Sequence, residues 1–309
     1  MHNSATQANA LQTSVGFRNR PDLLVYRLDG EDQRSWLNGQ VTGDVRNTRK
    51  GDSVYCLAIT VRGRIMADIW ALDDGACFRL LIPAASLPQL LESFESQIIM
   101  EDVEVTAEPM ARVVSVLGPK SRQLADALQQ PELVTYPGDE LGSGGLFILT
   151  QESRCEQLLN ELATAASAME GMQVDEEGYE LARLRKHVPR FGRDFDVTSY
   201  PQEAGLKHRA VAFDKGCYLG QEVVCTLENR GKLSRLLCSL DLEAAVPAGT
   251  ELTSDDGVIV GRITSVAFDP ERSLFLALGY VKRAKAMSGQ TVNAGQASAI
   301  IRNVVGEAG

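Results

Sequence analysis

The apolar pattern of this 309-residue chain changes at about residue 232, and this change constrains the fold most. Before it, strand-like apolar runs alternate with segments whose apolar residues recur at helical spacing. After it, short strand-like runs are separated by Gly, Asp and Pro, with no helical pattern. Residues 231–309 are therefore predicted to form a small β-barrel. The chain is also longer than one core usually supports, so we expect more than one domain.

The part that precedes the barrel predicts α+β structure. Residues 53–60, 64–72 and 77–82 are strand-like runs joined by short turns, which indicates an antiparallel meander, and a helix follows from Pro83 to about Gln97. A second alternation of strands and helices begins at Glu101. Paired antiparallel runs in this order are typical of α+β modules that resemble split βαβ units.

The first 14 residues are small and polar, with no basic segment followed by an apolar one. They predict a disordered tail and no signal peptide, so we expect a cytoplasmic protein. No apolar run approaches the roughly 18 residues that span a bilayer. The net charge of −10 argues against a general nucleic-acid binder. Residues 179–236, however, hold 11 Lys and Arg against 7 Asp and Glu, which indicates either a solvated basic face or a local site for an anionic ligand.

The octapeptide Lys-Gly-Cys-Tyr-Leu-Gly-Gln-Glu at residues 215–222 is the strongest chemical signal. Six cysteines are scattered without a C-x-x-C pair, which favours neither disulfides nor a zinc site, and most of them are simply explained as buried thiols. Cys217 differs because positive charge at Lys215 and the N–H groups of a helix starting near Gly220 would favour a thiolate. A structural thiol is the alternative for Cys217, and a resolving role for Cys225 is conceivable.

A long loop, residues 187–214, precedes the octapeptide, and loops of this length are usually functional. Within it, the Glu203 carboxylate could accept two parallel hydrogen bonds from an amidine-like edge such as that of a pterin. The alternative is an ion pair with a nearby basic residue. Residues 190–194 offer cations for ligand carboxylates and one aromatic face. The sequence contains none of the usual phosphate-binding loops, no G-x-S-x-G element and no H-E-x-x-H.

Together, residues 189–195, 201–206, 215–222 and Arg230-Gly231 resemble the YgfZ-type folate-binding proteins, which are relatives of the glycine-cleavage T-protein, an aminomethyltransferase. Residues 28–44 and 63–68 also fit, so the resemblance runs from about residue 20 to the end. It implies a three-lobed ring of two ferredoxin-like α+β modules and a C-terminal antiparallel β-barrel, with a folate in the central hole. The implied division is a discontinuous first module (15–100 and about 176–230), a second module (101–175) and the barrel (231–309).

The resemblance also implies a function and its residues. The function is support of iron–sulfur enzyme assembly or repair, including enzymes that thiolate tRNA, through a tetrahydrofolate-dependent step. Iron–sulfur client or assembly proteins would be the partners. The implied catalytic residues are Cys217 and Lys215. The implied folate-binding residues are Glu203, Arg190, Asp194, Tyr218, Gln221 and Asp68.

Three departures from the aminomethyltransferases affect this interpretation. Their paired Asp-Asp is Ala67-Asp68 here, and their Arg-Leu-Glu element is Arg183-Leu184-Arg185, which reverses a charge. The Ala-Arg or Val-Arg that often follows the octapeptide is Cys225-Thr226. The first two departures weigh against ordinary glycine-cleavage activity. Two alternatives remain: a true aminomethyltransferase that uses Asp68 and a lipoyl-carrier partner, and a non-enzymatic scaffold for iron–sulfur clients.

Overall fold

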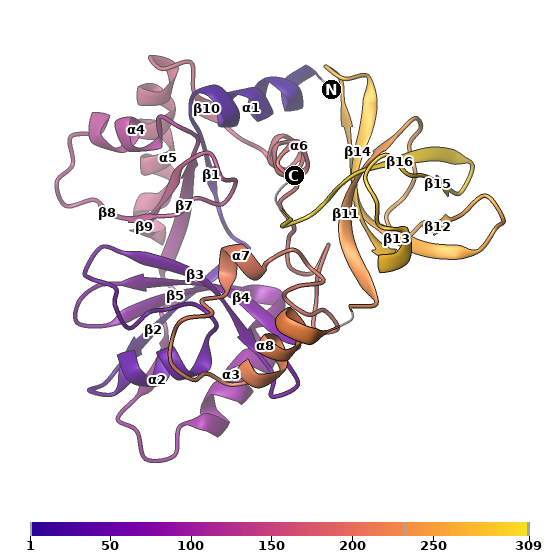
Figure 1. Cartoon of the computed structure of the whole chain (residues 1–309). Helices are drawn as coiled ribbons and strands as arrows, with labels where there is room; N and C mark the ends of the chain where they lie inside the picture. Colours follow the sequence, from indigo (N-terminus) through magenta and orange to yellow (C-terminus); the bar gives the residue numbers. More distant parts are fainter. Residues whose placement is uncertain (1, 232, 308–309) are drawn as a thin grey trace.

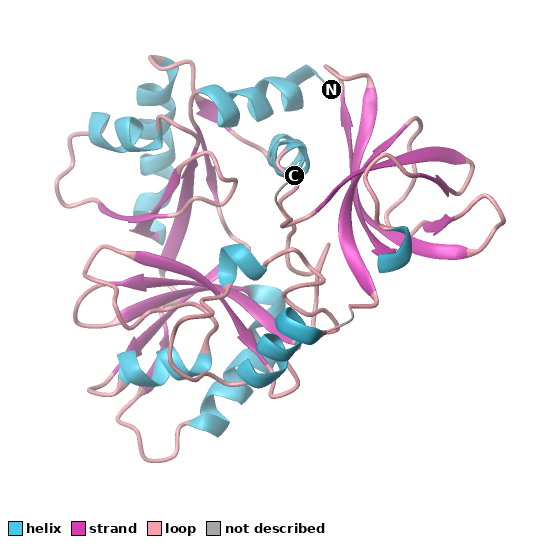
Figure 2. Cartoon of the chain, in the orientation of Figure 1, coloured by secondary structure: helices cyan, strands magenta, loops and turns pink. Residues whose placement is uncertain are grey.

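The computed structural model describes residues 2–231 and 233–307, and it arranges them as three lobes around a common centre (Figure 1). Two lobes each contain a five-stranded sheet with helices on its outer face, and the third is a closed barrel (Figure 2). The predicted α+β class with a C-terminal barrel is therefore confirmed. No helix within residues 2–231 or 233–307 is long and apolar enough to cross a membrane.

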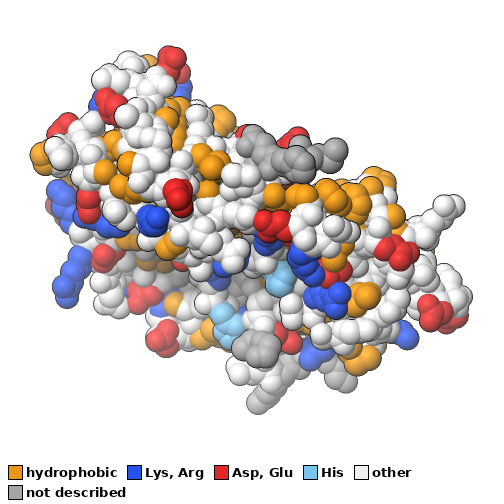
Figure 3. Space-filling view, turned by 90° about the horizontal axis from the view of Figure 1, so that it is seen from above, with side chains coloured by type: hydrophobic (Ala, Val, Ile, Leu, Met, Phe, Trp, Pro, Cys, Tyr) orange, Lys and Arg blue, Asp and Glu red, His pale blue; other side chains and the backbone are white. Residues whose placement is uncertain are grey.

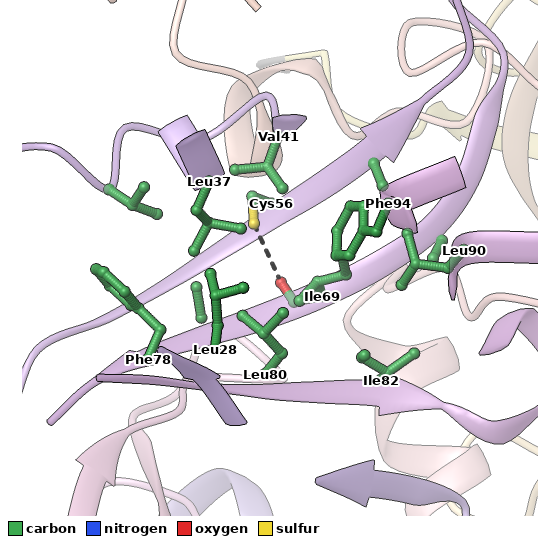
Figure 4. Packing of buried hydrophobic residues seen from close by; sticks show 14 of the residues in the cluster. Leu28, Leu37, Val41, Cys56, Ile69, Phe78, Leu80, Ile82, Leu90 and Phe94 are labelled. Atoms are coloured by element: carbon green, nitrogen blue, oxygen red, sulfur yellow. Dashed lines mark hydrogen bonds between the residues drawn. The ribbon is translucent and has the colours of Figure 1, made fainter. Parts of the chain in front are cut away.

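The first lobe is an antiparallel sheet of order β3-β4-β5-β2-β6. Its strands are β2 (Leu23–Asp29), β3 (Ser53–Ile59), β4 (Ile65–Asp73), β5 (Phe78–Pro83) and β6 (Glu104–Ala107). Helix α2 (Gln33–Gln40) follows a loop, and helix α3 (Leu87–Gln97) follows the 3-10 turn η1 (Ala84–Ser86). Both helices cover one face of this sheet. Leu37, Phe94 and Leu80 meet there in an apolar core (Figure 4). Cys56 lies in the same core and its thiol contacts the carbonyl oxygen of Ile69 at 3.6 Å, as a small buried side chain.

The second lobe is a sheet of order β10-β1-β7-β9-β8. Its strands are β1 (Gly16–Asn19), β7 (Ala111–Leu117), β8 (Val134–Pro137), β9 (Gly145–Gln151) and β10 (Met172–Gln173), and its helices are α4 (Ser121–Ala127) and α5 (Glu152–Ser167). The faces of the two sheets opposite their helices share a core, where Trp70 and Phe147 make an edge-to-face contact at 5.1 Å. The lobes are thus joined by apolar burial.

The two lobes exchange strands. Their boundaries in the sequence therefore differ from the predicted ones at residues 15 and 101. β1 precedes the whole first lobe in sequence but pairs antiparallel with β7 of the second lobe. β6 lies beyond residue 101 but pairs antiparallel with β2 of the first lobe. Strand pairing over long sequence distances is decided by which apolar faces meet, and a linear pattern does not record it.

The prediction of a disordered tail was wrong. Residues His2–Thr13 form helix α1, which lies above α6 (Glu176–Arg185) and between the second lobe and the barrel (Figure 1). Ala5, Ala8 and Leu11 are buried against α6, and a side chain added at Gly178 would meet Gln7 Oε1 at 2.1 Å. Small residues allow this close approach, and because they carry little hydrophobicity the sequence of the helix resembles a polar tail.

The barrel closes in the order β11-β14-β13-β12-β15-β16. Its strands are β11 (Arg235–Leu242), β12 (Glu251–Thr253), β13 (Ile259–Asp269), β14 (Leu274–Lys282), β15 (Thr291–Ala294) and β16 (Ala297–Val304), with the 3-10 turn η2 (Arg283–Lys285) after β14. Helices α7 (Lys207–Ala210) and α8 (Gln221–Arg230) lie in the segment that leads to it. Arg183 of α6 is fully buried where helix, loop and barrel meet, and it bonds Asp194 and Ser265, both at 2.7 Å.

Candidate functional site

A cavity of about 370 Å³ lies at the centre, between the first lobe, the second lobe and the loop that follows α6. Its volume falls within the range of small-molecule sites, roughly 300–1,000 Å³. Its walls combine carboxylates, arginines and aromatic rings. The charged and aromatic residues in these walls include Arg20, Tyr55, Asp68, Glu140, Tyr179 and Arg190.

Asp68 places a carboxylate on the cavity wall. It lies in β4, where side chains alternate between faces, so Asp68 and Trp70 face the cavity while Ile69 enters the helix-covered core. The Tyr55 hydroxyl donates to Asp68 Oδ2 at 3.0 Å. The other oxygen, Oδ1, is buried and has no hydrogen-bond partner among the described residues. Burial raises the pKa of Asp68 to about 6, and the hydrogen bond from Tyr55 only partly offsets this effect.

A second carboxylate enters the cavity from the loop between β8 and β9. Glu140 is paired with Arg20, whose Nε and Nη2 also donate to the two oxygens of Asp22, both at 2.9 Å. Burial acts to raise the pKa of Asp22, but the hydrogen bond and charge of Arg20 outweigh it and hold that pKa well below its usual range. Glu140 Oε2 is buried without a hydrogen-bond partner within the described part of the chain.

Three further arginines and two further aromatic rings belong to the walls. Arg190 donates to Glu180 Oε1 at 3.0 Å and also pairs with Glu176, so it is held in place at the cavity edge. Arg209 of α7 lies 5.2 Å from the ring centre of Tyr55, close enough for a cation–π contact. The remaining members are Arg193, Tyr179 and Phe191. Acidic and basic side chains are interspersed on the face seen in Figure 3, which displays no extended surface of one sign.

The structure brings only part of the predicted site together. Asp68 and Arg190 line the cavity. Asp194 lies behind it: its carboxylate accepts hydrogen bonds from Arg183 at 2.7 Å and from the backbone N–H of Arg190 at 3.1 Å. Asp194 therefore positions the arginine loop. Cys217, Lys215, Glu203, Tyr218 and Gln221 are not among the described residues that line the cavity.

Glu203 is the clearest departure from expectation. Its buried carboxylate lies 3.4 Å from Arg235 Nε and 3.6 Å from Arg64 Nη1, and Ser234 Oγ is 3.4 Å from its second oxygen. Its carbonyl oxygen also accepts from Leu237 N–H at the start of the barrel. Its position thus favours the ion-pair alternative over a pterin contact, but with arginines of β11 and of the β3–β4 turn. The sequence had suggested basic residues close to Glu203 in the chain. The actual partners are distant in the sequence because the loop folds back onto the barrel.

Lys215 serves the backbone of the first lobe. Its Nζ donates to the carbonyl oxygens of Asn38 and Val41, both at 2.8 Å, and of Gly43 at 2.5 Å. These contacts use all three ammonium hydrogens at the C-terminal end of α2. Burial lowers the pKa of Lys215 to about 8. The three hydrogen bonds of Lys215 therefore hold the backbone at the end of α2. None of these three reaches the neighbouring Cys217 thiol, which Lys215 was expected to activate.

The octapeptide presents Cys217 at the surface. Tyr218 is buried among Leu57 and Ile59, and this anchors the segment on the first lobe. Gly220 has φ +78, and a side chain there would meet Thr60 O at 2.4 Å, so the turn before α8 requires glycine. Gln221 begins α8, which extends to Arg230. Cys217 itself is exposed, whereas Cys225 is half-buried and the other four thiols are buried.

Sequence reasoning missed Arg20, Tyr55, Glu140, Tyr179 and Arg209 as members of one site. They come from β3, from α6 and α7, and from the segments that flank the second-lobe strands. No short motif contains two of them, so local spacing carried no signal. Only the strand exchange between the lobes brings Arg20 next to Glu140.

Comparison with known proteins places the fold. Residues 1–136 match the GCVT N-terminal domain model. The solved glycine-cleavage aminomethyltransferase T of Bartonella henselae superposes with a TM-score of 0.84 at 19% identity, covering 98% of this chain and 89% of that one. The lobes and barrel therefore define a protein of the aminomethyltransferase T fold.

Curated relatives narrow the class. The chain is 24% identical over 292 residues to a putative chloroplastic transferase of Arabidopsis thaliana, covering 87% of this chain and 66% of that protein. It is 24% identical over 226 residues to the tRNA-modifying protein YgfZ of Colwellia psychrerythraea, covering 71% and 69%. The chain is thus similar in sequence to YgfZ proteins and similar in fold to a glycine-cleavage T-protein.

Proposed function

We propose that the chain is a cytoplasmic, folate-binding accessory protein that supports the assembly or repair of iron–sulfur enzymes, including tRNA-modifying ones, by a tetrahydrofolate-dependent step. The observation that carries the proposal is the central cavity, where a buried oxygen of Asp68 has no partner among the described residues. Such an oxygen is costly unless a ligand donor meets it. The name of the Colwellia relative, a tRNA-modifying protein, supports the link to tRNA modification.

The residues of the cavity fit a folate. A pterin presents a ring N–H and an amino group, and Asp68 can accept both because Oδ1 is unpaired and Oδ2, held by Tyr55, keeps a second lone pair. The faces of Tyr55 and Tyr179 suit flat ring systems. Arg190, Arg193 and other cavity arginines suit the carboxylates of a glutamate tail, since guanidinium groups bind carboxylates in two-pronged fashion. When bound, a folate would supply the capacity to carry a one-carbon unit.

Asp68 is suited to hold or release a proton at the cavity wall. With a pKa of about 6, its carboxylate is largely ionised at neutral pH but accepts a proton more readily than an ordinary aspartate. Tyr55 holds Oδ2, whereas Oδ1 has no hydrogen-bond partner among the described residues. Proton transfer with a bound ligand would therefore occur at Oδ1.

Cys217 would act on a partner protein rather than in the cavity. Its side chain is exposed, and the residues that line the cavity within the described chain exclude it. An accessible thiol on a rigid, glycine-dependent turn can meet a group on the surface of a client. We therefore separate a ligand site at the centre from a thiol site at the surface.

A true aminomethyltransferase is the second candidate, and one observation favours it. Asp68 is an acid with a raised pKa in the central cavity, as a one-carbon transfer requires. Formation of methylenetetrahydrofolate from an aminomethylated lipoyl carrier would support this candidate. Rescue of iron–sulfur enzymes without folate binding would instead support a scaffold.

The first test is anaerobic calorimetry with tetrahydrofolate on the full chain and on Asp68→Asn. We expect micromolar binding by the wild type and at least tenfold weaker binding by the variant. Asp126→Asn, at an exposed position on α4, is the matched control and should bind normally. Absence of binding by the wild type would overturn the folate proposal.

A further inference from the structure

The cavity contains a second acceptor that the proposed function leaves unused. Glu140 is only 6% exposed, and its Oε2 has no hydrogen-bond partner among the described residues. Its other oxygen, Oε1, is held by Arg20. Buried side-chain oxygens in folded proteins are nearly always hydrogen-bonded. An unpaired oxygen on a residue that lines a cavity therefore points to a donor on the ligand.

The position of this oxygen is fixed by its surroundings. Arg209 Nη2 donates to the carbonyl oxygens of Asp139 at 2.8 Å and of Glu140 at 2.5 Å. Ser143 N–H donates to Asp139 Oδ1 at 3.0 Å, which closes the loop on itself. Arg20 is itself held by Asp22 through two hydrogen bonds. Glu140 is therefore preorganised, and Arg20 does not depend on it for a carboxylate partner.

Glu140 and Asp68 line the same cavity from different lobes. Asp68 belongs to β4 of the first lobe, whereas Glu140 belongs to the β8–β9 loop of the second lobe. Each carboxylate has one oxygen held by a protein donor, Tyr55 or Arg20, and one free buried oxygen. A ligand that satisfies both must present N–H donors at two separate places.

We propose that Glu140 is a specificity-determining residue, whose free carboxylate oxygen accepts a hydrogen bond from the pterin ring and, together with Asp68, selects the reduced ring. This inference rests on the proposed folate function. One carboxylate can read the N3–H and 2-amino edge, which oxidised and reduced pterins share. The other then meets the second ring, where only a tetrahydropterin has N–H donors, at N5 and N8. An oxidised ring would direct a nitrogen lone pair at that carboxylate, which is unfavourable.

Anaerobic calorimetry on the full chain with tetrahydrofolate and with folic acid tests the proposal. We expect the wild type to bind tetrahydrofolate at least tenfold more tightly. In Glu140→Gln, the amide oxygen can remain on Arg20, which turns the amide N–H₂ toward the ligand. Tetrahydrofolate should then bind at least tenfold more weakly, while folic acid binds equally or more tightly. Glu161→Gln, which alters a Glu–Arg pair on α5 outside the cavity, should keep the wild-type ratio.

The outcomes separate this inference from the proposed function. If the wild type binds neither compound, the folate function fails and the role of Glu140 fails with it. If the wild type binds both equally, the selectivity is overturned without reference to any variant. If Glu140→Gln is folded and keeps the wild-type ratio, Glu140 is only a structural partner of Arg20. Should that variant fail to fold, Glu140→Asp keeps the charge beside Arg20 but withdraws the acceptor, and an unchanged ratio in it would also overturn the proposal.

Discussion

The ammonium of Lys215 lies 2.8 Å from the carbonyl oxygen of Val41, across a gap of more than 170 residues in the sequence. This contact joins the octapeptide to the end of α2. The lysine therefore holds the segment against the first lobe and lets the neighbouring thiol face outward.

Replacement of Lys215 by Met should destabilise the protein. Three backbone carbonyls would lose their donor, and leaving buried acceptors unsatisfied costs about 1–3 kcal/mol each before water reaches them. We expect a loss of about 2–4 kcal/mol in the free energy of unfolding, measured by urea denaturation. Lys282→Met is a suitable control, since Lys282 donates to a single carbonyl at an exposed site. Equal stability of the Lys215 variant and the wild type would contradict the anchoring role.

Asp68 should make stability depend on pH. Its pKa is about 6 when folded and near 3.8 when unfolded, so between these values the folded state binds more protons. The contribution of Asp68 to stability therefore falls as pH rises from about 4 to 6, by roughly 2–3 kcal/mol in total. Asp68→Asn should lack this decline in a comparison of urea unfolding at several pH values. Parallel curves for the two proteins would show that Asp68 does not titrate in this window.

Binding of tetrahydrofolate should weaken in acid. If the ionised Asp68 accepts hydrogen bonds from the ligand, affinity falls by up to tenfold per pH unit below about 6, because a proton must first leave the carboxylate. Calorimetry between pH 5 and 8, in buffers of different ionisation enthalpy, would measure both the affinity and the proton released. An affinity that is constant across this range would remove Asp68 from the binding step.

Cys217→Ala should separate binding from function. Because Cys217 is exposed and outside the cavity, the variant should keep wild-type stability and tetrahydrofolate affinity. It should nevertheless fail to restore iron–sulfur enzyme activity in a strain that lacks the protein. Cys225→Ala, which alters a half-buried thiol on α8, should restore it. Full rescue by Cys217→Ala would eliminate the thiol from the mechanism.

Leu11→Ala tests the packing of α1. Leu11 is 1% exposed against α6 and its neighbours, so removal of its side chain should cost about 2–4 kcal/mol in the free energy of unfolding. Gln12→Ala, at the exposed position that follows, should change stability by less than about 0.5 kcal/mol. Thermal or urea denaturation of both variants would measure the difference. A neutral Leu11→Ala would mean that the helix contributes little to the folded state.

Much of the fold could be predicted because its elements repeat clear periods. The meander of β3, β4 and β5, the helix after Pro83 and the helix-free barrel all follow from apolar spacing. α1 could not be predicted in this way, because its buried face consists mostly of alanine. The exchange of β1 and β6 could not be predicted either, since pairing partners depend on tertiary packing.

The site could be predicted only where a motif held a residue that faces the cavity. Asp68 and Arg190 are such residues. Glu203 has a carboxylate that could bind a pterin, but in the structure this carboxylate pairs with Arg235 and Arg64. These arginines come near Glu203 only in the folded chain. Arg20 and Glu140 are far apart in sequence and meet only through the second lobe, so local patterns could not reveal their pairing.

The strand exchange also determines when the molecule can take shape during synthesis. β1 emerges first but its partner β7 follows some ninety residues later, and the segment matched by the N-terminal domain model ends within β8, before β9 joins β7 to β8. A nascent chain that stops at residue 136 would thus expose unpaired strand edges and have no complete second sheet. The strands of the first-lobe sheet end at Ala107, but the second-lobe sheet waits for β9 and β10, so synthesis must pass Gln173 before both lobes can close.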